Sequence, residues 1–115
     1  MTSAEQRIVR DWHTALNAGD IVRLQALCSQ DIEVGGPRGS GRGVDLLREW
    51  VERANIQLLP ERVEQQGNAI IVEQRAAWSG GEPQTVASLF ELREGRVARV
   101  IRFPDFDSAR EAARA

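Results

Sequence analysis

Two stretches decide the fold of this chain: Trp12-His13-Thr14-Ala15-Leu16-Asn17-Ala18-Gly19-Asp20 and Ile32-Glu33-Val34-Gly35-Gly36-Pro37-Arg38-Gly39. The first indicates the end of a helix, because glycine is common just past a helix C-terminus. Asp20 is then placed to cap a second, shorter helix over residues 21–28. The second stretch predicts a short strand, residues 32–35, followed by a loop over residues 35–43 that is rich in glycine.

Working outward from these stretches, two further segments carry the spacing of an amphipathic helix. Residues 4–17 and 44–54 place apolar side chains three and four positions apart, which gathers them on one helix face. Ser3 is positioned to cap the first of these helices. The apolar stripe of the first helix consists of Ile8, Val9, Trp12, Ala15 and Leu16.

The rest of the chain predicts strands joined by tight turns. The strands are expected over residues 56–65, 69–78, 84–93 and 96–103, which is typical of an antiparallel meander. Pro60 favours an edge position for the first of them. Residues 107–115 predict a short, frayed helix. The sequence thus indicates one α+β domain over residues 1–115, with three helices packed on a curved, mostly antiparallel sheet that encloses a pocket.

Composition narrows the classes of function. The 115 residues have a net charge of -2, which gives no general attraction to nucleic acid or to an anionic membrane. All 15 basic residues are arginine and tyrosine is absent, so lysine Schiff-base and phenol chemistry are excluded. The single cysteine, Cys28, has no partner for an internal disulfide, and no apolar run is long enough to span a bilayer. We therefore expect a cytoplasmic protein that binds neither nucleic acid nor membranes.

The two stretches quoted above resemble the nuclear transport factor 2-like (NTF2-like) superfamily, which includes the SnoaL-related polyketide cyclases and ketosteroid isomerase. The resemblance runs from about residue 4 to residue 104 and is strongest over residues 12–53. It implies a small cone-shaped domain with a pocket. It does not by itself imply a function, because this fold hosts enzymes, binding modules and transport factors.

The isomerases of this superfamily use an aspartate base, with a tyrosine and a protonated aspartate as hydrogen-bond donors to an oxyanion. The resemblance places these groups at Gly36, Trp12 and Ser88 of this chain. None of the three residues can take over the chemistry of its counterpart, since Gly36 has no side chain and Trp12 cannot titrate. The usual isomerase mechanism is therefore not expected here.

Three residues are candidates for catalysis, namely Arg102, His13 and Glu73. His13 is the only imidazole, but it points about 100° away from Trp12 around the helix, which favours a surface or helix-packing role over a catalytic one. Glu73 shares a strand face with Arg75. On the cavity side Glu73 can act as a base, whereas on the outer side the two residues are surface charges or dimer contacts.

Strand alternation leaves two positions open for Arg102. In one register it faces the helices together with Ala98 and Val100 and can hold a carboxylate or enolate oxygen of a substrate. In the other register it is a solvated charge outside, and Val97, Ile101 and Phe103 face inward. The same alternation groups Ser88 with Val86, Phe90 and Leu92.

The candidate ligand contacts are mainly apolar and aromatic. Tryptophan supplies flat apolar area and one N–H, which suits a planar ligand, although each tryptophan can equally be a core residue. One histidine and one cysteine on separate helices do not make a metal site, and no cofactor motif is present. The expected ligand-binding residues are Trp12, Leu16, Val34, Trp50, Trp78, Ser88, Phe90 and Val100.

Two functions fit these residues. The first is a pocket protein that binds a small hydrophobic metabolite, cyclic or carbonyl-bearing. The alternative is an isomerase, cyclase or hydratase that transfers protons in the same pocket. Both predict a homodimer through the outer face of the sheet, because Ile70 and Val72 alternate with Ile71 and leave apolar groups on both faces.

Overall fold

The computed structural model describes residues 3–36, 39–54, 56–78 and 81–114, and the side chains of Ala54 and Trp78 lie outside this description. Within the described residues the chain forms four helices and six strands. In chain order these are α1 Ala4–Ala18, α2 Ile21–Ala26, β1 Cys28–Gly36, β2 Gly39–Arg42, α3 Val44–Ala54, β3 Ile56–Gln66, β4 Ala69–Trp78, β5 Gln84–Arg93, β6 Arg96–Phe103 and α4 Phe106–Arg114.

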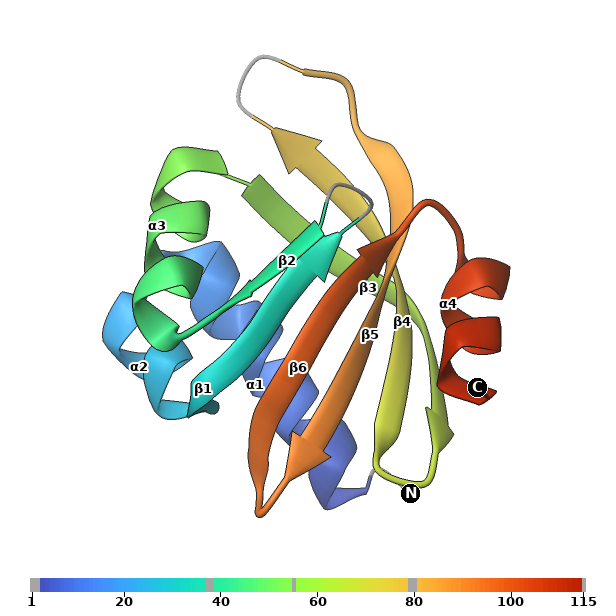
Figure 1. Cartoon of the computed structure of the whole chain (residues 1–115). Helices are drawn as coiled ribbons and strands as arrows, with labels where there is room; N and C mark the ends of the chain where they lie inside the picture. Colours follow the sequence, from blue (N-terminus) through green and yellow to red (C-terminus); the bar gives the residue numbers. More distant parts are fainter. Residues whose placement is uncertain (1–2, 37–38, 55, 79–80, 115) are drawn as a thin grey trace.

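The six strands form one curved sheet with the order β2-β1-β6-β5-β4-β3 (Figure 1). Strands β1 and β6 are parallel and the other neighbouring pairs are antiparallel. Helices α1, α2 and α3 lie on one face of this sheet, and α4 lies on the other (Figure 1). The predicted α+β class, the mostly antiparallel sheet and the edge position of the strand that contains Pro60 are confirmed.

The helix ends follow the capping residues that the sequence indicates. The Ser3 hydroxyl accepts a hydrogen bond from the Gln6 amide at 3.1 Å, at the start of α1. Gly19 ends α1 with a φ of 72°, in the left-handed region that glycine adopts without strain. The Asp20 carboxylate accepts from the Arg23 amide at 3.1 Å and so begins α2. These caps define where α1 begins and ends and where α2 begins.

Residues 39–42 differ from the prediction, since they form strand β2 rather than loop. They pair with β1 in an antiparallel hairpin, with Glu33 opposite Arg42 and Gly36 opposite Gly39. Glycine-rich segments have low strand propensity, and here the pairing to β1 overrides that preference. The glycines also permit close packing, because a Cβ atom on Gly41 would collide with the Leu46 side chain of α3.

The sheet separates two apolar clusters. The larger one lies between the sheet and α1, α2 and α3, and it includes Trp12, Ile70, Val72 and Phe90. Ile71 points the opposite way and belongs to the second cluster, under α4. The predicted alternation of apolar residues on β4 is therefore confirmed, and its cause is the two-residue period of a strand.

The C-terminal helix is a packed element, not the frayed segment that the sequence suggested. Phe106 and Ala109 of α4 are buried against Ala69, Ile71, Ala87 and Leu89 of the sheet. The Arg110 guanidinium also donates two hydrogen bonds of 2.9 Å to the Glu64 carboxylate of β3. Helix α4 thus covers apolar residues that were expected to form a dimer interface, and the homodimer stays a prediction.

A bulge in β6 changes which residues of that strand face the helices. Glu91 pairs with Arg99 but Leu92 pairs with Val97, so the register shifts by one residue at Ala98. Val97, rather than the expected Ala98, consequently lies in the larger apolar cluster with Val100. Beyond the bulge the alternation is regular, and Arg102 lies on the helix side.

Candidate functional site

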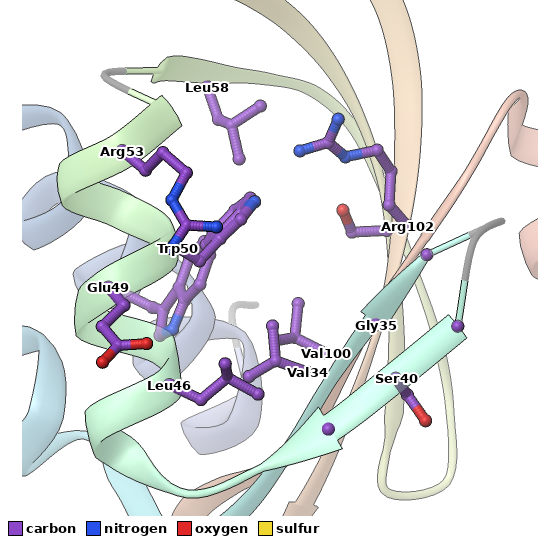
Figure 2. Close-up of a pocket in the computed structure, with 15 residues that line it drawn as sticks. Val34, Gly35, Ser40, Leu46, Glu49, Trp50, Arg53, Leu58, Val100 and Arg102 are labelled. Carbon is purple, nitrogen blue, oxygen red and sulfur yellow. The ribbon is translucent and has the colours of Figure 1, made fainter.

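A cavity of about 1070 Å³ lies between α3, the β1–β2 hairpin and the inner face of the sheet, and it is open to solvent. Figure 2 shows α3 forming one wall and strands β1 and β6 forming the wall opposite. Cavities of this size between helices and a sheet commonly bind small molecules. The lining from the sheet and from α1 includes Trp12, Val34, Leu58, Ser88, Val100 and Arg102.

Helix α3 supplies four side chains to the cavity. The spacing of these residues, three or four positions apart along α3, places them on one face of the helix. They are Leu46, Glu49, Trp50 and Arg53. Figure 2 shows Leu46 and Trp50 projecting from α3 toward the cavity, whereas the carboxylate of Glu49 points away from it. Leu47, on the opposite side of the same turn, is fully buried in the apolar cluster. The helix therefore presents a mixed apolar and charged face to a ligand.

Arg102 projects into the cavity from β6, so the inward register is correct (Figure 2). Its guanidinium carbon lies 5.6 Å from the centroid of the Trp50 ring, a cation–π contact that links the sheet to α3. The side chain is half-buried, and this burial lowers the pKa of the guanidinium from its ordinary value. Arginine nevertheless stays charged at any ordinary pH.

The charge on the cavity wall is positive overall among the described lining residues. Arg53 and Arg102 carry two positive charges, and Glu49 carries the negative one. Glu49 is exposed, whereas Arg102 is half-buried. The part of the cavity around Arg102 therefore favours an anionic or carbonyl oxygen.

Three polar side chains lie in a row behind the cavity wall. The Ser88 hydroxyl donates to Gln74 Oε1 at 2.8 Å, and Gln74 Nε2 lies 2.8 Å from His13 Nε2. His13 Nδ1 is in turn 2.8 Å from the carbonyl oxygen of Val9, one turn earlier in α1. Ser88 lines the cavity, but Gln74 and His13 are buried behind it, with exposed fractions of 0% and 2%.

The buried position of His13 determines its charge. Burial removes water from the imidazolium form and lowers the pKa of His13 to about 4, although the hydrogen bond to the Val9 carbonyl acts in the opposite direction. His13 is therefore neutral near pH 7. It faces a smaller cavity of about 270 Å³ instead of the large one.

Trp12 borders the cavity from α1 and is fully buried. Its ring meets Phe90 edge to face, with centroids 4.9 Å apart and planes at 76°. Its indole N–H makes no hydrogen bond of ordinary geometry within the described residues, and it lies near the Cys28 thiol. Burial raises the pKa of that thiol to about 12, so Cys28 is not a nucleophile.

The structure brings most of the sequence-predicted site residues together but not all. Leu16 and Phe90 belong to the apolar cluster that supports the cavity. Glu73 lies between Val72 and Gln74 on β4, both of which face the helices, so Glu73 lies on the face covered by α4. The predicted site residues that do line the cavity are Trp12, Val34, Trp50, Ser88, Val100 and Arg102.

One predicted ligand contact, Trp78, cannot be placed, and several residues that line the cavity were not predicted. The Trp78 side chain lies outside the described residues. Leu46, Glu49 and Arg53 line the cavity but were not predicted. Their spacing from Trp50 could have identified them, since residues three and four apart share a helix face. Leu58 gave no signal in the sequence, because its position depends on how β3 approaches α3.

The described residues contain no cluster of three or more histidine, cysteine or acidic side chains that could hold a metal ion. None of the helices in the same part of the chain has the length and apolar character that a membrane crossing requires.

Comparison with known proteins supports the fold and gives a family. The profile of the SnoaL-like domain matches residues 9–100. A candidate polyketide cyclase from Sinorhizobium meliloti is 25% identical, with a TM-score of 0.75 over 84% of this chain and 93% of that one. An NTF2-like protein from Cytophaga hutchinsonii is 15% identical, with a TM-score of 0.81 over 91% and 92% of the two chains. A candidate ketosteroid isomerase from Kribbella flavida is 20% identical, with a TM-score of 0.81 over 90% and 80%. No protein of curated function matches the chain.

Proposed function

Because the chain belongs to the SnoaL-like domain family, we propose that its cavity binds a small, largely apolar molecule that contains a ring and carries an anionic or carbonyl oxygen. The ligand lies between α3 and the sheet, with its oxygen at Arg102. We also propose that the protein is cytoplasmic and that it binds neither nucleic acid nor membranes.

One observation carries this proposal, namely a half-buried arginine in a mostly apolar cavity. Placing the Arg102 guanidinium among Trp50, Val100 and Leu58 removes part of its hydration. An anionic oxygen from a ligand would compensate for that loss through charge-assisted hydrogen bonds. A guanidinium has five N–H donors, so a ligand can be added to the contacts that Arg102 already makes.

The aromatic side chains favour a flat ligand. Trp50 projects into the cavity from α3, and the buried Trp12 borders the cavity from α1. A planar ring placed against an indole buries apolar area on both partners and adds favourable aromatic contact. A chain-like ligand would leave more of this flat surface in contact with water.

The proposal is tested by calorimetric titration with two naphthalene derivatives of opposite charge. We expect 2-naphthoate to bind more tightly than the cation 2-naphthylmethylamine. Arg102→Gln should weaken 2-naphthoate binding by about tenfold, since a hydrogen bond to a charged group is lost. The matched control is Arg96→Gln, which makes the same charge change on an exposed residue of the same strand. Equal binding of both compounds, or an equal effect of the two variants, would contradict the proposal.

A second candidate, proton transfer, is favoured by the position of Glu49. Among the described residues that line the cavity, Glu49 is the acidic one, and it belongs to the same helix as Trp50. A carbonyl oxygen at Arg102 would be polarised, and Glu49 would accept a proton from the adjacent carbon. The likeness to a candidate polyketide cyclase at 25% identity adds to this candidate. The buried His13 and the outward Glu73 have no part in it.

Deuterium exchange distinguishes binding from proton transfer. An enzyme of this type should accelerate the exchange of the protons next to the carbonyl of 1-tetralone in heavy water, as followed by proton NMR. Glu49→Gln should abolish the acceleration, whereas Glu52→Gln, on an exposed carboxylate of the same helix, should not. If the protein binds 2-naphthoate but leaves the exchange rate at its background value, the binding function stands alone.

A further inference from the structure

We propose that Ser88 presents a hydrogen-bond acceptor, and no donor, to the cavity, so that the protein prefers ligands with a hydroxyl or N–H donor beside the oxygen held by Arg102. This inference rests on the proposed binding function and specifies the class of ligand. It follows from the row of hydrogen bonds that links Ser88 to α1.

The direction of these hydrogen bonds is set at the far end of the row. The Val9 carbonyl oxygen can only accept, and His13 Nδ1 lies 2.8 Å from it. Nδ1 must therefore carry the proton of the ring. Because burial keeps His13 neutral near pH 7, its other nitrogen, Nε2, has a lone pair and acts as an acceptor.

The tautomer of His13 determines the orientation of the Gln74 amide and of the Ser88 hydroxyl. His13 Nε2 needs a donor, and the atom that lies 2.8 Å from it is the amide nitrogen of Gln74. The amide oxygen of Gln74 then faces Ser88 and accepts its hydroxyl proton at 2.8 Å. Ser88 has one proton, and this hydrogen bond uses it. The hydroxyl is left with lone pairs for any group that enters the cavity.

The reverse direction would leave buried atoms without partners. With the proton on Nε2, the lone pair of His13 Nδ1 would face the Val9 carbonyl oxygen, which places two acceptors 2.8 Å apart. His13 and Gln74 are 2% and 0% exposed, so water does not relieve this contact. Two acceptors that face each other without water have a much higher free energy than a donor paired with an acceptor.

The position of Ser88 connects this acceptor to the proposed anion site. Ser88 and Arg102 are directly opposite each other on β5 and β6, and both line the cavity. Directly opposed side chains of an antiparallel pair have their Cβ atoms about 5 Å apart. A ligand that uses both needs an acceptor oxygen and a donor group on the same edge, as on the meta positions of one aromatic ring. By resemblance Ser88 stands where the isomerases carry an oxyanion donor, so its polarity toward the ligand is the opposite of theirs.

The first test measures the tautomer of His13 and needs no ligand. The chain has one histidine, so the long-range proton–nitrogen NMR spectrum of ¹⁵N-labelled protein contains one imidazole. At pH 7 we expect the proton on Nδ1 and an unprotonated Nε2. A proton on Nε2, or a doubly protonated ring, would overturn the inference.

The second test compares two probes that differ in one hydrogen-bond donor, 4-hydroxy-2-naphthoate and 4-methoxy-2-naphthoate. We expect the hydroxy compound to bind the wild-type protein about tenfold more tightly. Ser88→Ala should remove most of this preference, and the His13 NMR signal shows whether the variant is folded. The matched control is Ser108→Ala, because Ser108 lies on α4, on the face of the sheet opposite the cavity (Figure 1); this variant should keep the preference.

The outcomes separate this inference from the proposed function. Equal binding of the two probes, or a preference that survives Ser88→Ala, overturns the inference while 2-naphthoate binding still supports the proposed function. Failure of every naphthoate to bind contradicts the proposed function, and the ligand preference falls with it.

Discussion

At the scale of single residues, His13 illustrates how a side chain's chemistry depends on what surrounds it. As the only histidine it was a natural candidate for acid–base catalysis. The structure buries it between Val9 and Gln74, where its ring completes a row of hydrogen bonds. Sequence indicates that the imidazole is present, but burial decides that it stays neutral, and burial depends on packing across α1 and β4.

The pKa of His13 predicts how stability depends on pH. The folded value of about 4 lies below the ordinary value of 6.5, so the unfolded chain binds more protons between these values. The contribution is fully present above pH 6.5 and is lost as the pH falls toward 4. In that range the free energy of unfolding should fall by up to about 1.4 kcal/mol per pH unit.

Urea unfolding at a series of pH values from 7.5 to 5 measures this slope. His13→Phe removes the titrating group, so the slope should largely disappear over the same range even though the variant is less stable overall. A slope that is unchanged in His13→Phe would show that other groups are responsible.

At the scale of elements, the contact between β2 and α3 shows that a glycine-rich segment can be a closely packed strand and not a loop. The composition of residues 35–43 predicted a loop, yet Gly41 lies in a strand and is packed against Leu46. Loop-like composition and a requirement for close approach both favour glycine, and only the structure distinguishes them. The helices and the long strands were predictable because their apolar periodicity extends over many residues.

This contact can be tested with a double-mutant cycle. Gly41→Ala should destabilise the protein by about 1 kcal/mol, because the new methyl group forces the end of the Leu46 side chain to rotate away. In a Leu46→Ala background the same substitution should cost much less. Thermal unfolding of the four proteins measures the coupling, and additive effects would mean that the two residues are not in contact.

Helix α4 gives the second prediction at this scale. Phe106 is buried against the sheet face opposite the cavity, so Phe106→Ala should lower the free energy of unfolding by about 3 kcal/mol. The control Asp107→Ala changes an exposed residue of the same helix and should have little effect. Chemical denaturation compares the two variants, and equal small losses would indicate that α4 does not pack as described.

At the scale of the whole molecule, the fold was more predictable than the cavity. Helix and strand order follow from local patterns, whereas the cavity needs residues from α1, α3, β3, β5 and β6 to meet in space. The side of the sheet taken by Arg102 was left open by the sequence, and the bulge at Ala98 altered the pattern on that strand. Such features depend on register between strands, which short-range patterns do not determine.

The homodimer is also a prediction about the whole molecule. The structure supports it less than the sequence did. Apolar residues on the outer face of the sheet were its motivation, and α4 packs on that face. Residues such as Leu59 and Val63 on the edge strand β3 are exposed and leave apolar area for a partner. Sedimentation at micromolar concentration should give the mass of a dimer, and a monomer would contradict this prediction.

Binding of a small ring compound with an anionic or carbonyl oxygen, in the cavity between α3 and the sheet, is the proposal on which the function of this protein depends. Its most direct test is a proton–nitrogen NMR titration of the ¹⁵N-labelled protein with 2-naphthoate. We expect saturable shifts of the Trp50 indole N–H and of the amides of Gly35, Val100 and Arg102, with little change in α4. Shifts confined to α4 or to other surfaces, or no saturable shifts at all, would contradict it.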